Sequence, residues 1–158
     1  MRIRLIGEGK TKGLQLRALE ADYKARIERF TDMVVEEAPP DRAASGSGQS
    51  RSRERVSSAE RRLLERVRGS YKVLLDAGGR EWTSEEFARW LGAQALRGTR
   101  ELAFLVGGPQ GFSAAFKKQA DLLLALSRMT LTRDWARALL LEQIYRGFTI
   151  LRGYPYAK

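Results

Sequence analysis

Three short segments, two of them with paired glycines and the third with hydroxyl-bearing residues, each follow a run that predicts a β-strand. They are residues 75–79 (LDAGG), 106–111 (VGGPQG) and 126–131 (LSRMTL). Open α/β sheets bind ligands beyond the carboxyl ends of their strands, and glycine lets a backbone approach a ligand closely. The middle segment has neither the dinucleotide-binding nor the P-loop spacing, and alone it is typical of a tight turn. Three such segments at neighbouring strand ends favour a binding site.

The residue types that are absent restrict the chemistry of this site. The 158 residues include no cysteine and no histidine. Their absence excludes a disulfide scaffold, thiolate and imidazole metal sites, a cysteine nucleophile and histidine-based triads. We therefore expect no metal. Any general base must be a carboxylate, a lysine, a tyrosine, water or the substrate's own anion.

Short apolar runs alternate with amphipathic patterns, and together they predict the elements that position these segments. Strands are predicted at 3–6, 33–35, 71–76, 102–106 and 122–126, and the last run is also compatible with a helix. Helices are predicted at 16–30, 57–67, 83–91, 113–120 and 134–151. The alternation predicts an α/β fold with a mainly parallel sheet and helices on both faces. The length fits a single domain, with a flexible basic loop at 41–55 and a tail at 152–158.

Residue pairs at helical spacing support three of the predicted helices. Two are capping boxes and one is an ion pair between residues i and i+4: Ser57 with Glu60, Thr83 with Glu86, and Glu142 with Arg146. The unbroken apolar run at 102–106 is typical of a central strand that is covered on both faces. The sequence therefore predicts that this strand lies inside the sheet.

The charge of the chain favours a polyanionic partner. Lysine and arginine number 29 against 19 acidic residues, a formal net charge of +10, and such a field attracts RNA, DNA or anionic membranes. A basic surface that serves only solubility is the alternative. Residues 41–72 hold nine basic and four acidic side chains. We expect Arg51, Arg53 and Arg55 to contact RNA phosphates, with a solvated helix face beside a disordered loop as the alternative.

The hydropathy of the chain excludes several classes of protein. An apolar content of 43% is too high for a disordered chain. No apolar run approaches the roughly 20 residues of a membrane span, and the N-terminus lacks the apolar core of a secretion signal. We therefore expect a soluble, cytoplasmic protein that does not enter a membrane.

Four separated stretches carry a resemblance to a known family: LLDAGGREWTSEEFA, FLVGGPQGFS, LSRMTLTRDWARALLLEQIYRGFTI and GYPYAK. In this order and spacing they resemble the ribosomal large-subunit pseudouridine N3-methyltransferases, which belong to the SPOUT class of S-adenosylmethionine-dependent RNA methyltransferases. The resemblance covers the whole chain, although residues 41–55 match poorly. It implies a SPOUT-type α/β fold with a C-terminal trefoil knot. It also implies a homodimer in which the partner subunit completes the substrate site.

The resemblance also implies which residues hold the cofactor, S-adenosylmethionine. Carried over position by position, they are Leu75, Gly107, Leu126, Ser127, Arg128, Met129, Thr130 and Leu131. Leu75 and Met129 would pack on the adenine, and backbone groups would bind its polar edges and the ribose. An apolar pocket with a few backbone groups suits a cofactor without phosphate. Plain core packing is the alternative role of Leu75, Leu126 and Leu131.

For the reaction, the resemblance implies methyl transfer to N3 of a pseudouridine in 23S rRNA on the assembled ribosome. Arg146, in the pair Tyr145-Arg146, is the first candidate for orienting the base and stabilising its developing anion. Tyr156 in the tail is the second candidate, and Arg133 the third. The alternative role of Arg146 is its helical ion pair with Glu142.

This chain departs from the family pattern at three positions. Arg133 and Ala157 stand where many relatives carry histidine, and Gln110 stands where glutamate is common. Arg133 still supplies a cation and a donor, but it cannot act as a base near neutral pH. Two other functions therefore stay open: a SPOUT methyltransferase with a different RNA substrate, and a non-catalytic RNA-binding or ribosome-assembly factor on the same fold.

Overall fold

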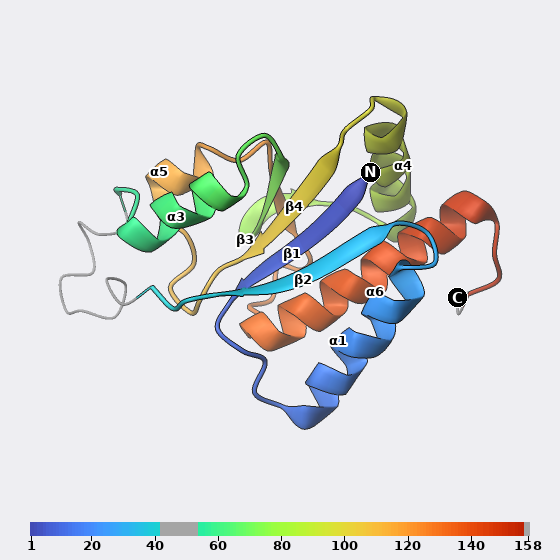
Figure 1. Ribbon diagram of the computed structural model, residues 1–158, viewed down its shortest axis with the longest axis horizontal. Coiled ribbons are helices and arrows are strands. Elements are labelled where there is room, and N and C mark those ends of the chain that lie inside the picture. The colour runs from blue at the N-terminus through green and yellow to red at the C-terminus, as the bar shows by residue number, and fades with distance from the viewer. Residues whose placement is uncertain (42–53, 157–158) are drawn as a thin grey trace.

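The computed structural model describes residues 1–41 and 54–156 of the chain. Its five strands are β1 (Arg2–Glu8), β2 (Asp32–Ala38), β3 (Tyr71–Glu81), β4 (Glu101–Val106) and β5 (Leu122–Ala125). The helices are α1 (Leu14–Ile27), α3 (Ser58–Arg66), α4 (Ser84–Leu96), α5 (Ala114–Lys117) and α6 (Arg133–Arg152). Strands and helices alternate along the chain (Figure 1). The predicted fold class, an α/β protein, is confirmed.

The five strands form one sheet in the order β2-β1-β4-β3-β5, and every neighbouring pair is parallel. β4 lies at the centre, as its continuous apolar run predicts, and all its residues from Leu102 to Val106 are buried. The short apolar run 122–125 is a strand and not a helix. Because all strands are parallel, their carboxyl ends meet at one edge of the sheet, which we call the carboxyl edge.

Helices cover both faces of the sheet, so alternate residues of β4 enter two different cores. Leu102, Phe104 and Val106 join a cluster with residues of α1, α4 and α6, whereas Ala103 and Leu105 join a cluster on the side of α3 and α5. Figure 1 shows α1 and α6 side by side below β2, with α3 and α5 on the opposite side. The helices on both faces are thereby confirmed.

β3 runs farther than the sequence predicts. The predicted strand ends at residue 76, before Gly78 and Gly79, but the strand continues to Glu81. Leu75 and Arg80 both pair with Leu124, so residues 76–79 bulge out between two paired stretches. A Cβ atom on Gly79 would lie only 2.7 Å from the carbonyl carbon of Leu123. Glycine therefore permits the second paired stretch of β3, Arg80 and Glu81, to lie directly against the backbone of β5.

The local signals for helix ends are confirmed. At the start of α3, the side chain of Ser57 accepts from the N–H of Glu60, and the carboxylate of Glu60 accepts from the N–H of Ser57. At the start of α4, Thr83 and Glu86 form the same reciprocal pair. α6 begins one residue before the predicted Asp134 and ends at Gly153, which has a φ of +64°. Such a left-handed residue is a common end of a helix, and glycine adopts it without strain.

An ion-pair network covers the sheet beside α3. Arg4 donates to Glu36 at 2.9 Å and to Glu101 at 3.1 Å, and it also reaches the carbonyl oxygen of Arg66 at 2.9 Å. Arg66 itself pairs with Glu36. Burial opposes ionisation of Glu36, but the two guanidinium groups outweigh it and lower the pKa of the carboxyl. The network joins α3 to β1, β2 and β4, and its two positive and two negative charges neutralise one another.

Candidate functional site

The three segments meet at the carboxyl edge, as the sequence predicts. β4, β3 and β5 are neighbours in the sheet; Gly107 and Leu126 directly follow β4 and β5, and Leu75 ends the first paired stretch of β3. Leu75 and Leu126 are half-buried and pack against the same core cluster as α6. Their partial exposure leaves apolar surface at this edge, which a ligand can cover.

The bulge of β3 forms one wall of this edge. Asp76 accepts a hydrogen bond from the backbone N–H of Gly78 at 2.8 Å and pairs with Lys117 at the end of α5. Burial disfavours the charged carboxylate, but these two contacts outweigh it and lower the pKa of Asp76. The ionised side chain therefore holds the glycine turn against α5.

The segment after β5 forms a second wall, and several of its side chains are exposed. Ser127 Oγ accepts from the N–H of Met129 at 2.9 Å, which closes a tight turn. Arg128 pairs with Glu81 at 3.0 Å, near the end of β3. The side chain of Met129 is 77% exposed, so Met129 is not part of the core. Thr130 and Leu131 are also exposed. This half of the segment lies at the surface, where it can contact a ligand.

Gly107 and Gly108 follow β4, and they line a pocket together with Glu8, Glu60 and Phe112, which the other proposed cofactor residues, Leu75 and residues 126–131, do not line. A Cβ on Gly107 would lie 3.3 Å from the ring of Phe112, and one on Gly108 only 2.4 Å from the carboxylate of Glu8. A side chain at either position would crowd or collide with these groups, so the two glycines permit Phe112 and Glu8 to lie against the backbone. The edge thus offers half-buried apolar side chains and, at Gly107, half-buried backbone without a side chain, a combination that suits an uncharged heterocycle with polar edges.

Arg146 and Tyr156 lie together in an aromatic cluster that consists of Tyr23, Phe30, Tyr145, Phe148, Tyr154 and Tyr156. The guanidinium of Arg146 lies 4.7 Å from the ring centre of Tyr156 and donates to Glu142 at 2.7 Å. The predicted helical ion pair is thus present, and its hydrogen bond raises the pKa of Arg146. Burial and the hydroxyl of Tyr23, 3.0 Å away, raise the pKa of Tyr156. Tyr156 therefore keeps its proton.

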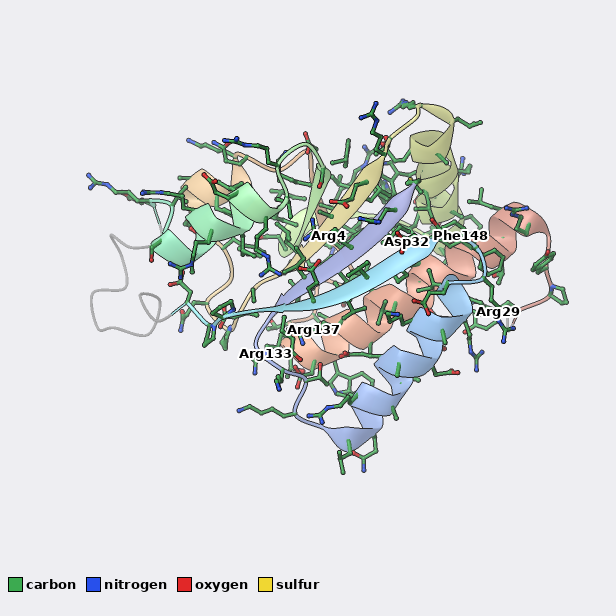
Figure 2. The ribbon with its side chains drawn as sticks, in the orientation of Figure 1. Arg4, Arg29, Asp32, Arg133, Arg137 and Phe148 are labelled. Carbon is green, nitrogen blue, oxygen red and sulfur yellow. The ribbon has the colours of Figure 1, made fainter. Side chains whose placement is uncertain are left out.

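Arg133 lies far from this pair. It is the first residue of α6, and its guanidinium lies over Gly9, at the end of β1, while it pairs with Asp134 at 3.4 Å. Thirteen residues separate it from Arg146, a rise of about 20 Å along a helix. Figure 2 shows Phe148 toward the C-terminal end of α6 and Arg133 at the opposite end of the helix. One chain alone does not bring the three catalytic candidates together.

Two of the three predicted RNA-binding arginines, Arg51 and Arg53, lie outside the described residues, as does most of the basic loop. Arg55 is described and exposed. The helix that follows, α3, presents Arg61 and Arg62 to solvent. The described part of this region therefore has exposed cations, as a phosphate-binding surface requires.

The sequence pattern does not single out Arg137, which is buried in the structure. Arg137 in α6 is only 2% exposed, although it stands in the same helix as the apolar Leu140, Leu141 and Ile144. Its guanidinium contacts the loop between β1 and α1. The available signal was an arginine on the apolar stripe of a helix, together with glycines at 7, 9 and 13 after the first strand.

The described residues also bear on metal ions and membranes as binding partners. Residues 1–41 and 54–156 contain no group of three or more acidic side chains placed to hold a metal ion. None of the described helices is long and apolar enough to cross a membrane.

Comparison with known proteins extends these observations. Residues 1–157 match the family model described as "Predicted SPOUT methyltransferase". Proteins named ribosomal RNA large subunit methyltransferase H match over nearly their full length. The protein from Geobacter sp. (strain M21) is 40% identical over 99% of this chain and 98% of its own. The proteins from Clostridium kluyveri and Streptococcus mutans are 39% and 33% identical, each with both chains covered completely.

A solved structure shares the fold at low sequence identity. The crystal structure of a "putative methylase family protein" from Neisseria gonorrhoeae aligns with a TM-score of 0.53 and 12% identity, over 99% of this chain and 95% of that one. The likeness supports the α/β architecture, and the trefoil knot is what the SPOUT class implies for it. On these full-length matches and this sheet, the chain belongs to the SPOUT methyltransferases and, among them, to the ribosomal RNA large subunit methyltransferase H family.

Proposed function

We propose that this protein methylates N3 of a pseudouridine in 23S rRNA on the assembled ribosome, with S-adenosylmethionine as the methyl donor. The observation that carries the proposal is the intact strand-end site in a chain that matches the methyltransferase H relatives from end to end. When bound, the cofactor supplies an activated methyl group, so the protein mainly has to align the accepting nitrogen.

The residues at the carboxyl edge fit this cofactor. Leu75 and Leu126 offer half-buried apolar surface for the adenine, and exposed Met129 can close over it. Gly107 and Ser127 are half-buried, and their backbone groups are proposed to bind the polar atoms of the base and the ribose. The remaining proposed contacts, Arg128, Thr130 and Leu131, lie on the same turn.

Arg146 and Tyr156 are proposed to bind the target base. The accepting nitrogen loses a proton, and a fixed cation such as Arg146 stabilises the negative charge that develops on the base. Because its pKa is raised, Tyr156 keeps the proton on Oη and donates a hydrogen bond to the base instead of acting as its general base. Arg133 supplies a further cation at the other end of α6.

The distance between these groups supports a homodimer. In one chain, Arg146 and Tyr156 lie at the edge where β2 begins, whereas the cofactor residues lie at the opposite edge of the sheet. A second copy that packs with α6 antiparallel brings the Arg146 end of one subunit to the cofactor edge of the other. A two-fold axis makes both sites identical. We infer that a complete site contains residues of two subunits.

The experiment that tests the function is methyl transfer from labelled S-adenosylmethionine to ribosomes that lack the modification, with the product nucleotide identified by mass spectrometry. Label at N3 of a pseudouridine in 23S rRNA is the expected result. Label on another nucleotide would show that the protein methylates a different RNA target. Cofactor binding without transfer to any ribosomal RNA, or no cofactor binding at all, would refute the proposed activity.

A further inference from the structure

The loop between β1 and α1, residues 9–13 (GKTKG), has no regular secondary structure, yet polar contacts hold it firmly at the carboxyl edge. The buried guanidinium of Arg137 donates to the carbonyl oxygens of Glu8 at 2.8 Å and Gly9 at 2.7 Å, and to the hydroxyl of Thr11 at 3.1 Å. Hydrogen bonds from a charged, buried donor are among the stronger ones in proteins. Arg137 therefore fixes the path of the first half of the loop.

Side chains of α1 and α6 hold the second half of the loop. Arg17 donates to the carbonyl oxygen of Thr11 at 2.9 Å, and the hydroxyl of Thr11 donates to Glu20 at 2.7 Å. The N–H of Lys12 donates to Asp134 at 3.1 Å. The backbone from residue 8 to residue 12 is thus tied to two helices.

Two glycines let the guanidinium groups approach this backbone. A Cβ on Gly7 would lie 2.1 Å from Nε of Arg137, and one on Gly9 would lie 2.9 Å from Nη1 of Arg133. Gly9 also has a φ of +66°, which other residues rarely adopt. Figure 2 shows Arg133 and Arg137 close together where β1 runs into the loop.

Two lysines of this loop carry positive charges that face the solvent. Lys10 and Lys12 are exposed, and within residues 1–41 and 54–156 neither ammonium group has an ion-pair partner. Beside them, Glu8 adjoins Gly108, so the loop borders the strand end that carries Gly107. A rigid backbone lowers the entropy lost when these side chains bind a ligand.

We propose that Lys10 and Lys12 form a phosphate-contact site, which binds the sugar–phosphate backbone of the RNA substrate next to the cofactor edge. The inference rests on the proposed function, because it takes RNA as the substrate. Lysine binds phosphate as a point charge without reading the base. The site therefore positions the RNA chain and leaves base recognition to other residues.

The test compares two double variants that each remove two positive charges. Lys10→Gln with Lys12→Gln removes the proposed site. Arg97→Gln with Arg100→Gln is the matched control, since both arginines are exposed and lie before β4, at the opposite edge of the sheet. The probe is a labelled hairpin transcript of the 23S rRNA segment that the wild-type protein methylates, bound over a series of salt concentrations.

The lysine variant should bind the hairpin about tenfold more weakly at 50 mM salt, and the slope of log affinity against log salt should fall by about 0.7 for each lost phosphate contact. The control variant should keep the wild-type slope. An unchanged slope in the lysine variant, or an equal fall in the control, would overturn the proposal.

Failure of the proposed function is seen separately. S-adenosylmethionine affinity and methyl transfer by the wild-type protein report on that function. If the wild-type protein transfers methyl groups while the lysine variant keeps both its salt slope and its KM for ribosomes, the phosphate-contact site alone is wrong.

Discussion

Gly79 offers a sharp test of the way β3 and β5 pack at the carboxyl edge. In Gly79→Ala the new Cβ would lie 2.7–2.8 Å from three backbone atoms of Leu123 and Leu124. An ordinary carbon contact is about 3.5–4.0 Å, so the two segments must move apart by almost 1 Å. Backbone cannot rotate away as a flexible side chain can. Overpacking of this kind costs about 1–3 kcal/mol, and we expect the upper end of that range.

Gly92→Ala is the matched control, because it is the same chemical change with the opposite expected sign. Its Cβ would meet Cδ2 of Leu151 at 2.9 Å, but that side chain is 43% exposed and can turn away. Gly92 lies inside α4, where alanine is favoured over glycine by about 1 kcal/mol. We expect this variant to be as stable as the wild type or slightly more stable.

The assay is urea unfolding of both variants, with thermal melting as a second measurement. For a chain of this length, each kcal/mol shifts Tm by about 2–4 °C, so Gly79→Ala should melt roughly 4–12 °C lower. Its affinity for S-adenosylmethionine should fall as well, because Leu126 follows directly on the displaced strand. An unfolding free energy of Gly79→Ala within about 0.5 kcal/mol of the wild type, a change typical of neutral surface sites, would refute the reasoning.

Three other predictions concern the base-binding arginine, acid stability and a helix cap. Arg146→Ala should reduce methyl transfer by about 100-fold, as the loss of one charge-stabilising donor does elsewhere, and leave cofactor affinity unchanged; unchanged turnover would exclude Arg146 from the mechanism. Asp76 and Glu36 have lowered pKa values in the folded state, so their stabilisation is present above about pH 4, the ordinary pKa of such groups, and is lost as pH falls through the lowered values. In Asp76→Asn the urea midpoint should therefore fall less steeply than in the wild type as pH decreases from about 4 to 2. The same fall in both proteins would contradict this. Thr83→Ala should destabilise α4 by about 1 kcal/mol, measured by urea unfolding, and an unchanged midpoint would exclude the cap as a source of stability.

The elements with strong local signals could be predicted from the sequence. The capping boxes at Ser57 and Thr83 begin α3 and α4 as expected, because their hydrogen bonds join residues only three apart. The apolar run of β4 indicated its central position for a similar reason, since no solvated face interrupts it. The meeting of Leu75, Gly107 and Leu126 followed from the rule that parallel strands end at one edge.

The features that depend on distant partners could not be predicted in this way. The glycines at 78 and 79 are typical of a strand end, and only pairing with β5, more than 40 residues later, lets β3 continue. The role of Arg137 depends on carbonyl groups at Glu8 and Gly9, at the other end of the chain. The apolar pattern of α6 alone cannot predict contacts with residues so distant in the sequence.

The position of β5 has a consequence for the order in which the protein folds. β5 is an edge strand of four residues whose neighbour in the sheet is β3, and the paired residues Val73 and Leu122 are 49 positions apart. A parallel pair has no hairpin turn from which pairing could spread, so the entropy of closing this long segment is lost before any ladder hydrogen bond forms. β1 and β4 close a still longer segment, since Arg2 pairs with Glu101, so both pairings are non-local and intrinsically slow to form. The backbone from Leu126 onwards follows directly on β5, so we expect the cofactor edge to take its final shape only after the long-range pairing of β3 with β5.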